Sequence, residues 1–256
     1  TRWKNVLMQM VLFNLSRKKP EWIKALVRGV NRNALGKDYP VDVHFKPKYN
    51  PWDQRFCVVP DSDLFLAIRR GKASVVTDHI ETFNATGIRT KSGQQIDADI
   101  VITATGLVMK LMEGMQILVD GREGKINEAL VYKGMMVSDV PNLAMAVGYT
   151  NASWTLKCDL IAEYVCRLLN HMDRNGYRQC TPRRNDPSVK EEKLLDFSSG
   201  YFQRAAQDLP KQGNKKPWKL AQNYFVDTFM FKRSALDDGT MEFSNPVAAV
   251  TLAKAA

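Results

Sequence analysis

One short segment, residues 99–106 with the sequence DIVITATG, constrains the fold of this chain more than any other. An acidic residue is followed by four residues that favour β-strands, and the run ends in small residues and a glycine. Short apolar runs of this kind are typical of strands buried inside the parallel sheet of an α/β protein. The segment therefore predicts an α/β fold. It leaves open what the turn at its end holds, because many α/β folds contain such turns without binding anything there.

The first forty residues combine helical periodicity with an excess of positive charge. Apolar residues at spacings of three and four predict helices over 5–15 and 20–30, the second opened by Pro20. One apolar face of the first helix is expected to lie in a core; it consists of Leu7, Met10, Val11 and Leu15. Nine Lys or Arg against two acidic residues give this segment +7 of the chain's total charge of +10. A solvated face, nucleic acid, an anionic membrane surface and a phosphorylated cofactor all remain explanations of that charge.

The passage that leads up to residue 99 predicts a small β-meander. Residues 63–70 have the pattern of a short helix that ends at Gly71, and residues 73–77 predict a strand. Turns at 84–87 and 91–93 then separate short β segments. A meander inserted into a parallel sheet is found in flavoproteins with two dinucleotide-binding domains, and also in other α/β folds, so the shape alone does not choose between them.

A second junction between a strand and a helix lies further along the chain. Residues 141–149, PNLAMAVGY, predict a buried strand, and residues 153–176 predict a long amphipathic helix. Thr150, Asn151 and Ser153, between the two, are residue types that cap helix N-termini. A helix N-terminus offers unpaired N–H groups and a positive dipole end, which suit a phosphate or a reduced flavin. A purely structural turn is the alternative, because most such junctions bind nothing.

The remaining segments are less regular, and the sequence shows no internal repeat. Residues 115–121 and 129–137 predict strands, residues 182–193 an exposed loop, and residues 201–209 and 218–233 helices.

Several motifs that would identify a function are absent from the sequence. No two glycines are two residues apart, so there is no G-x-G-x-x-G, and no P-loop, H-E-x-x-H or G-x-S-x-G occurs. The four cysteines form no C-x-x-C pair and the three histidines are scattered, which argues against a metal site and for a reducing cytoplasm. Because the chain opens in mid-pattern without Met, we expect a fragment whose phosphate-binding turns lie outside residues 1–256.

Several stretches in combination resemble the second half of flavin-containing monooxygenases, in the branch of Baeyer–Villiger type. They are DIVITATGL at 99–107, KYNPWDQRFCVVPDSDLF at 48–65, PNLAMAVGYTNASWTLKCDLIAEYVCRLL at 141–169 and PWKLAQNYFVDTFMFKRSALDDGTMEF at 217–243. The resemblance implies part of a flavoprotein with two dinucleotide-binding domains, built on a mixed sheet with a β-meander and flanking helices. It implies the later part of an inserted NADPH-binding domain at 1–106, the C-terminal part of the FAD-binding domain at 107–181, and a C-terminal extension at 182–256.

The resemblance also implies a chemistry. NADPH reduces FAD, and the reduced FAD takes up O₂ as a C4a-peroxyflavin that inserts one oxygen atom into a small hydrophobic ketone or adds it to sulfur. Arg55 matches the family's active-site arginine and is the expected catalytic residue; where relatives often carry a lysine for the NADP 2′-phosphate, this chain has Gln54. The expected cofactor-binding residues are Asp99, Ala104, Thr105, Gly106, Gly148, Thr150, Asn151 and Ser153.

Two other classes of protein remain open at this point. One is a different flavoprotein oxidoreductase that uses a pyridine nucleotide, such as a disulfide reductase. The other is a non-enzymatic basic module that binds nucleic acid or a membrane through residues 1–40. Within the monooxygenase hypothesis we expect a cytoplasmic protein without specific nucleic-acid binding, and peripheral membrane docking through residues 5–30 is a further hypothesis.

Overall fold

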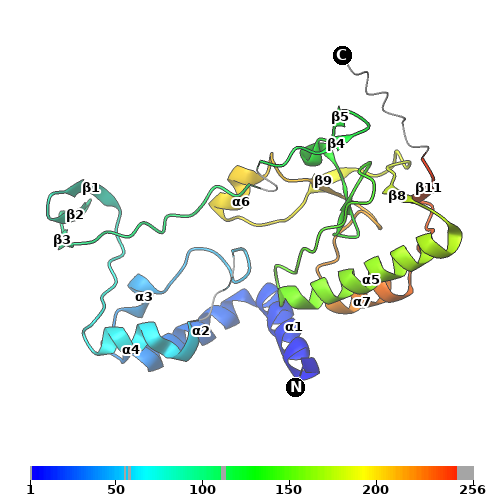
Figure 1. The fold of residues 1–256 in the computed structure, drawn as a ribbon. Helices are drawn as coiled ribbons and strands as arrows, with labels where there is room; N and C mark the ends of the chain where they lie inside the picture. The colour runs from blue at the N-terminus through cyan, green and yellow to red at the C-terminus, as the bar shows by residue number, and fades with distance from the viewer. Residues whose placement is uncertain (1, 55, 57–58, 111–113, 247–256) are drawn as a thin grey trace, which may run out of the picture. The chain divides into compact units, whose positions relative to one another are not determined.

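The computed structural model describes residues 2–54, 56, 59–110 and 114–246 and shows a mixed α/β protein with small antiparallel sheets. The described residues form two compact units (Figure 1). Unit 1 lies within residues 1–107 and includes 198–200; unit 2 lies within 108–197 and 201–256.

Unit 1 begins with two helices, as the spacing predicts. Helix α1 spans Arg2–Lys18 and α2 spans Pro20–Leu35, with Pro20 in the first turn of α2. The short helices α3 (Val41–His44) and α4 (Asp63–Arg69) pack against α2, and the 3₁₀ turn η1 (Pro60–Ser62) leads into α4. The expectation that Leu7, Val11 and Leu15 lie in a core is wrong, because they are 49%, 64% and 38% exposed. Val6 and Ser16 are the residues that α1 buries.

The predicted β-meander is present in unit 1. Strands β1 (Ile80–Asn84), β2 (Gly87–Thr90) and β3 (Gln95–Asp97) form an antiparallel sheet in that order. Gly87 has a φ of 149°, and a Cβ atom there would lie 2.1 Å from the carbonyl oxygen of Ile96, so only glycine fits this pairing. Residues 73–77, predicted as a strand, are irregular.

The segment at 99–106 is not a strand in unit 1, contrary to prediction. Ile100 and Ile102 are 79% and 86% exposed, and no ladder of the described residues includes either. The physical reason is that a strand is stable only when its N–H and C=O groups are paired and its apolar side chains are covered. Neither condition is met in the part of unit 1 that the structure describes.

Unit 2 contains tight hairpins where longer strands are predicted. Strand β4 (Leu118–Val119) pairs with β5 (Arg122–Glu123), and β6 (Val131–Tyr132) pairs with β7 (Met136–Val137). The 3₁₀ turn η2 (Ile126–Glu128) lies between these hairpins. The run 129–137 folds back on itself because Lys133 and Gly134 adopt φ values of 49° and 73°, which turn the chain.

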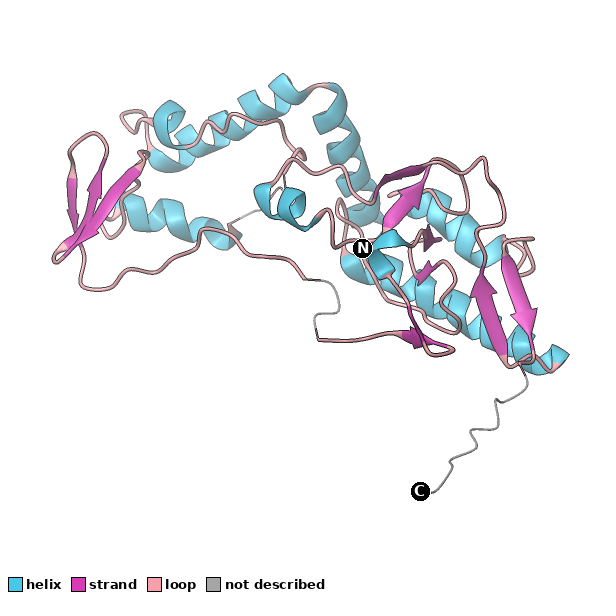
Figure 2. Ribbon diagram, turned by 90° about the horizontal axis from the view of Figure 1, so that it is seen from above, coloured by secondary structure: helices cyan, strands magenta, loops and turns pink. Residues whose placement is uncertain are grey.

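Two helices of unit 2 pack against each other. Helix α5 (Trp154–Asn175), which the sequence predicts almost to the residue, and α7 (Tyr224–Arg233) lie side by side (Figures 1 and 2). Helix α7 begins later than predicted, because residues 218–223 are irregular. Leu160 and Tyr164 of α5 and Phe231 of α7 are buried. The ring of Tyr164 packs edge-on against Phe231, with centroids 5.7 Å apart, and its hydroxyl lies 3.2 Å from that of Tyr132 in β6.

Short strands and one short helix complete unit 2. Strand β8 (Gln179–Pro182) pairs with β11 (Met241–Ser244), β9 (Glu191–Lys193) pairs with β10 (Lys211–Gly213), and α6 spans Gly200–Ala205. The run 182–193, predicted as a loop, therefore contains a strand. The predicted strand at 141–149 is irregular, although Met145 donates its backbone N–H to the carbonyl of Met135 at 2.7 Å.

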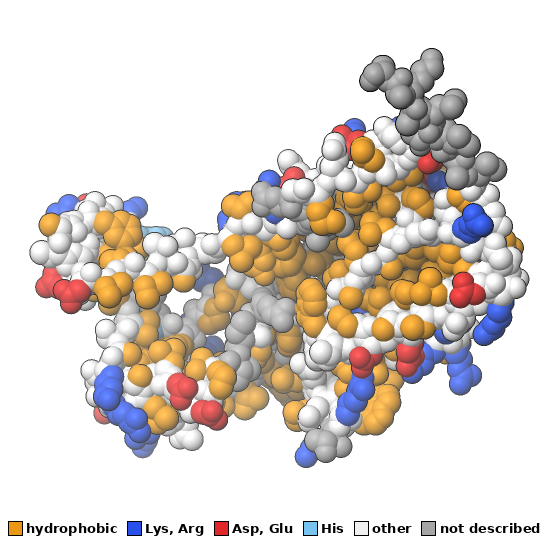
Figure 3. All heavy atoms as spheres, viewed as in Figure 1, with side chains coloured by type: hydrophobic (Ala, Val, Ile, Leu, Met, Phe, Trp, Pro, Cys, Tyr) orange, Lys and Arg blue, Asp and Glu red, His pale blue; other side chains and the backbone are white. Residues whose placement is uncertain are grey.

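The surface of unit 2 carries many hydrophobic side chains. They are orange in Figure 3 and spread over much of the face around α5; Trp154 and Leu169 of that helix are 50% and 54% exposed. Among the described helices, none combines the length and the apolar character needed to cross a bilayer. Apolar areas of this kind mark surfaces that contact other molecules or further parts of a protein.

Candidate functional site

The structure describes all the predicted site residues except one, and those it describes form two groups along the chain. Arg55 lies outside the described residues. Asp99, Ala104, Thr105 and Gly106 lie together in unit 1, on the exposed extended segment, where Gly106 has a φ of 103°. Gly148, Thr150, Asn151 and Ser153 lie in unit 2, on the turn that enters α5. The structure thus brings the last four residues together on one turn, which we call the α5 entry turn (residues 148–153).

Gly148 is required by the packing of this turn. A Cβ atom on Gly148 would lie 2.3 Å from Cγ of Trp154 and 2.5 Å from its Cα atom. The first residue of α5 therefore packs directly onto the glycine backbone, and any side chain there would displace the start of the helix. Gly148 fixes where the N-terminus of α5 begins.

The start of α5 has the properties that suit an anionic or electron-rich ligand. Ser153 occupies the N-cap position, but its side chain makes no capping hydrogen bond; its Oγ lies 2.9 Å from Oγ1 of Thr155 instead. The first turn of α5 contains no acidic residue. Leu156 donates its backbone N–H to the carbonyl of Ser153 at 3.3 Å, and no acidic side chain within the first turn neutralises the positive end of the helix dipole.

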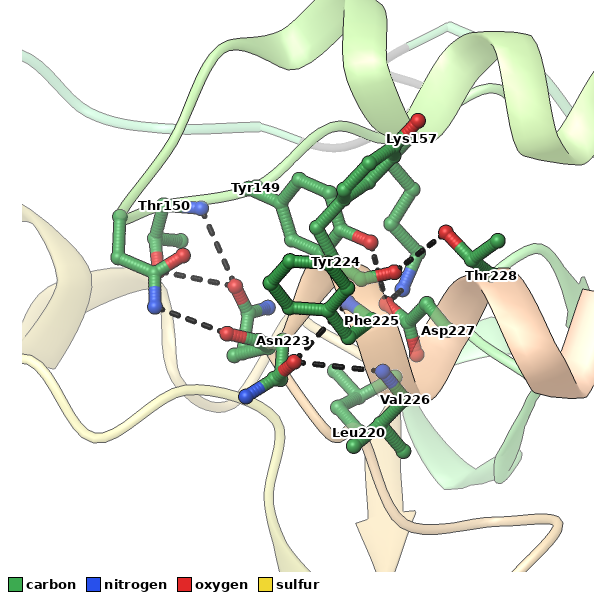
Figure 4. A network of polar contacts seen from close by, with 12 residues as sticks. Tyr149, Thr150, Lys157, Leu220, Asn223, Tyr224, Phe225, Val226, Asp227 and Thr228 are labelled. Carbon is green, nitrogen blue, oxygen red and sulfur yellow. Dashed lines mark hydrogen bonds and ion pairs between the residues drawn. The ribbon is translucent and has the colours of Figure 1, made fainter. Parts of the chain in front are cut away.

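The α5 entry turn is held by the segment that leads into α7. The side-chain Oε1 of Gln222 accepts hydrogen bonds from the backbone N–H and from the hydroxyl of Thr150, both at 3.2 Å (Figure 4). The side-chain amide of Asn151 donates to the backbone carbonyl of Gln222 at 2.9 Å. Gln222 itself has a φ of 48°, an uncommon conformation for a residue other than glycine.

Behind the turn lies a buried charge cluster, which sequence reasoning missed. Oδ2 of Asp227 accepts a hydrogen bond from the hydroxyl of Tyr149 at 2.7 Å and one from the ammonium of Lys157 at 3.1 Å (Figure 4). Tyr149 and Asp227 are fully buried, and Lys157 is 2% exposed. Burial, followed by the charge of Asp227, raises the pKa of Tyr149. The other oxygen of this carboxylate, Oδ1, has no partner within the described residues.

A second buried lysine ties the hairpin β6–β7 to the C-terminal segment. The ammonium of Lys133 lies 3.1 Å from Oδ2 of Asp238, which also accepts a hydrogen bond from the hydroxyl of Tyr132 at 2.7 Å. Burial raises the pKa of Asp238, but the hydrogen bond from Tyr132 and the charge of Lys133 outweigh it and leave that pKa below its ordinary value. Burial raises the pKa of Tyr132.

The sequence contains a signal for one of these two buried lysines, Lys157. Lys157 stands within the apolar stripe of α5, next to Leu156 and one turn before Leu160 and Ile161. A charged residue on the buried face of an amphipathic helix requires a buried counter-charge. Asp227, embedded in the apolar run YFVDTFMF, is such a residue.

Unit 1 contains a cavity of about 490 Å³ that is lined by Gln54 and by four aromatic side chains, Phe45, Tyr49, Trp52 and Phe56. Its charged lining residues are Glu21, Lys24, Arg28 and Lys46. Lys24 pairs with Glu21 at 2.9 Å, and Arg28 pairs with Asp42 at 3.5 Å. Trp52 has a φ of 70° and packs edge-on against Phe13, with ring centroids 5.3 Å apart. The ion pair between Arg17 and Asp53, at 2.7 Å, fixes the same loop. Aromatic walls with cations at the edge suit an apolar molecule that carries a negative or polar group.

Comparison with known proteins finds close relatives. No family model matches the chain. The FAD-containing monooxygenase EthA of Mycobacterium tuberculosis is 48% identical over 249 residues, which are 97% of this chain and 51% of that protein. EthA of Mycolicibacterium smegmatis is 44% identical over 250 residues, 98% of this chain and 51% of that protein. An Acinetobacter protein named "Probable FAD-binding monooxygenase AlmA" is 49% identical over 247 residues, 95% of this chain and 49% of that protein.

The chain spans about half the length of these relatives. The matched residues make up 95–98% of this chain, so they include residues of both units. The resemblance to FAD-containing monooxygenases that the motifs indicate is thus confirmed along nearly the whole chain.

Proposed function

We propose that the chain is the C-terminal part of an FAD- and NADPH-dependent monooxygenase that transfers one oxygen atom from O₂ to a small hydrophobic ketone or to sulfur. The observation that carries this proposal is the 48% identity over 249 residues with a protein named as an FAD-containing monooxygenase. A shared activity follows from this identity only if the residues at the candidate site can carry out the chemistry. The α5 entry turn and the cavity of unit 1 support that condition.

The α5 entry turn fits FAD. When bound, FAD supplies electron transfer from NADPH and the activation of O₂. The residues of this chain would hold it at the start of α5, where the first turn contains no acidic residue, the Ser153 side chain makes no capping hydrogen bond, and Gly148 leaves the helix start in close contact with the preceding backbone. An electron-rich edge of the flavin would be stabilised by the dipole end of α5.

The exposed apolar segment of unit 1 supports a place in a larger sheet. Ile100 and Ile102 project from an extended backbone with no neighbouring strand among the described residues. We propose that residues 99–106 become a buried strand between two dinucleotide-binding domains, with residues 1–106 in the NADPH-binding domain and 107–181 in the FAD-binding domain. Asp99, Ala104, Thr105 and Gly106 would then approach the cofactors through a backbone with small side chains.

Arg55 is the proposed catalytic residue. A guanidinium stays charged at any working pH and donates hydrogen bonds from a rigid fork, so it would hold negative charge on the reacting oxygen. The cavity beside Gln54 supports an apolar organic substrate, through Trp52 and Phe45. Lys46 and Arg28 in the same cavity are cations that suit the phosphate of NADPH, where Gln54 offers no charge.

The experiment is the Arg55→Ala variant of the flavoenzyme that contains this chain. We expect NADPH to reduce the flavin, whereas the rate of oxygen transfer falls ~100- to 1,000-fold, as for other preorganised electrostatic donors. The NADPH consumed should then appear as H₂O₂. Arg55→Lys should restore little, since an ammonium lacks the planar fork. Arg89→Ala, which removes an exposed arginine of the β-meander that pairs with Glu81, is the matched control.

Two results would contradict the proposal. The first is an Arg55→Ala enzyme that forms oxygenated product at the wild-type ratio to NADPH, which would remove Arg55 from the site. The second is a wild-type flavoenzyme that passes its electrons to a disulfide and not to O₂, which would favour a different flavoprotein oxidoreductase. A yellow preparation of the 256-residue chain alone would contradict a narrower expectation, that the phosphate-binding turns lie outside residues 1–256.

A further inference from the structure

The α5 entry turn is bound by hydrogen bonds to residues 222–227, which are the last residues before α7 and its first turn. Three consecutive residues of the chain, 149 to 151, each make a hydrogen bond to the segment 222–227, which lies about seventy residues later in the sequence. Such a run of contacts to one distant segment fixes both the position and the rotation of a turn. We propose that Gln222 is a positioning residue for FAD binding, which acts through Thr150; this inference rests on the proposed function.

The geometry assigns a particular task to the side chain of Gln222. Its Oε1 accepts from the backbone N–H of Thr150 and from the hydroxyl of the same residue, both at 3.2 Å. The N–H of Thr150 is thereby occupied from within the protein, and so is that of Leu156, which donates to the carbonyl of Ser153 at 3.3 Å, so a ligand would be met by the N–H groups between these two residues. The acceptor on Gln222 determines which N–H groups of the turn face a ligand.

The backbone of Gln222 is anchored so that the side chain can do this. Its φ of 48° is strained for a residue other than glycine, and such conformations persist where the surroundings determine them. The carbonyl of Gln222 accepts from Asn151, and the next residue, Asn223, caps α7 by accepting from the backbone N–H groups of Phe225 and Val226 (Figure 4). Helix α7 therefore orients Gln222, and Gln222 orients the turn.

The chain offers variants that separate the acceptor from the shape of the side chain. Gln222→Met has a similar length but no oxygen, whereas Gln222→Glu keeps an acceptor at the same place. The surface ion pair between Lys232 and Glu163, at 2.9 Å, also links α7 to α5 but lies away from the turn. Lys232→Gln is therefore the matched control, which loosens the same two helices without touching residue 150.

The first measurement is FAD affinity of the flavoenzyme that contains this chain, from quenching of flavin fluorescence on titration of the apoenzyme. Gln222→Met removes both hydrogen bonds to Thr150 and should bind FAD at least about fivefold more weakly than wild type, the size expected from one neutral hydrogen bond. Gln222→Glu and Lys232→Gln should stay within about twofold of wild type. A loss of FAD affinity in Gln222→Met that Lys232→Gln does not share would place the effect at the turn and not in the general contact between α5 and α7.

The second measurement needs no flavin. Amide hydrogen exchange over residues 148–155 of the 256-residue chain should become faster in Gln222→Met and stay as in wild type in Gln222→Glu. Unchanged exchange in Gln222→Met, or equal FAD affinity in Gln222→Met and wild type, overturns the inference. If wild-type flavoenzyme takes up no FAD, the proposed function fails, and the exchange result alone decides whether Gln222 positions the turn.

Discussion

The buried pair of Lys157 and Asp227 makes a quantitative prediction about stability. Lys157 is 2% exposed and Asp227 is fully buried, so each charge depends on the other for compensation. Removing one partner of a buried ion pair costs about 3–5 kcal/mol, because the remaining charge is left in a medium that solvates it poorly. We expect a loss of that size in the free energy of unfolding for Lys157→Met and also for Asp227→Leu. Tyr149→Phe, which leaves the pair intact, should cost only about 1 kcal/mol.

The double variant Lys157→Met, Asp227→Leu distinguishes charge compensation from packing. With both charges gone, the hydroxyl of Tyr149 is the group that loses its partner, so the double variant should lie within about 2 kcal/mol of wild type. The double-mutant cycle should therefore give a coupling energy of at least about 3 kcal/mol. The assay is urea unfolding of the 256-residue chain followed by far-ultraviolet circular dichroism. Additive losses in the double variant would refute the reasoning, since they would show that Lys157 and Asp227 contribute independently.

Two further predictions concern other parts of the chain. Gly87→Ala should abolish the β-meander while unit 2 stays folded, because the added methyl group would lie 2.1 Å from the carbonyl oxygen of Ile96; amide exchange of β1 to β3 measures this, and retained protection there would contradict it. Asp238→Asn should flatten the acid dependence of stability. A carboxylate with a lowered pKa stabilises the fold above its unfolded pKa of about 3.9, and this contribution disappears as pH falls through the folded pKa. Unfolding midpoints between pH 6 and pH 3 should therefore fall more steeply in wild type than in the variant, and equal slopes would count against the Lys133–Asp238 pair.

The helices could be predicted from the sequence because their signals are local. The apolar periodicity of α5 and the proline at the start of α2 operate within one or two turns. The strand prediction at 99–106 depends on partners, and the described residues supply none; the prediction at 129–137 overlooked that Lys133 can adopt the positive φ of a turn beside Gly134. A β-strand forms only when it pairs with another strand, so the pattern of one segment is weaker evidence for a strand than apolar periodicity is for a helix.

In the candidate site, too, the residues with a local sequence signal could be predicted and those that depend on distant contacts could not. The capping residue types at 150, 151 and 153 indicated the α5 entry turn, and the structure places them on one turn. Gln222 and Asp227, which hold that turn, lie in the run 218–233, for which the sequence predicts only a helix. No local pattern connects residues that are seventy positions apart, so only the three-dimensional structure reveals them.

The distance along the chain between the α5 entry turn and Gln222 has a consequence for biosynthesis. A ribosome releases residues 148–153 well before it makes residue 222, and contacts of such long sequence separation form late in folding. Until residues 222–227 emerge, Thr150 lacks the acceptor that sets its orientation and Tyr149 lacks its carboxylate. Uptake of the proposed FAD at this turn would thereby wait for residues 222–227, and a product that stops before α7 would lack the contacts that shape the turn.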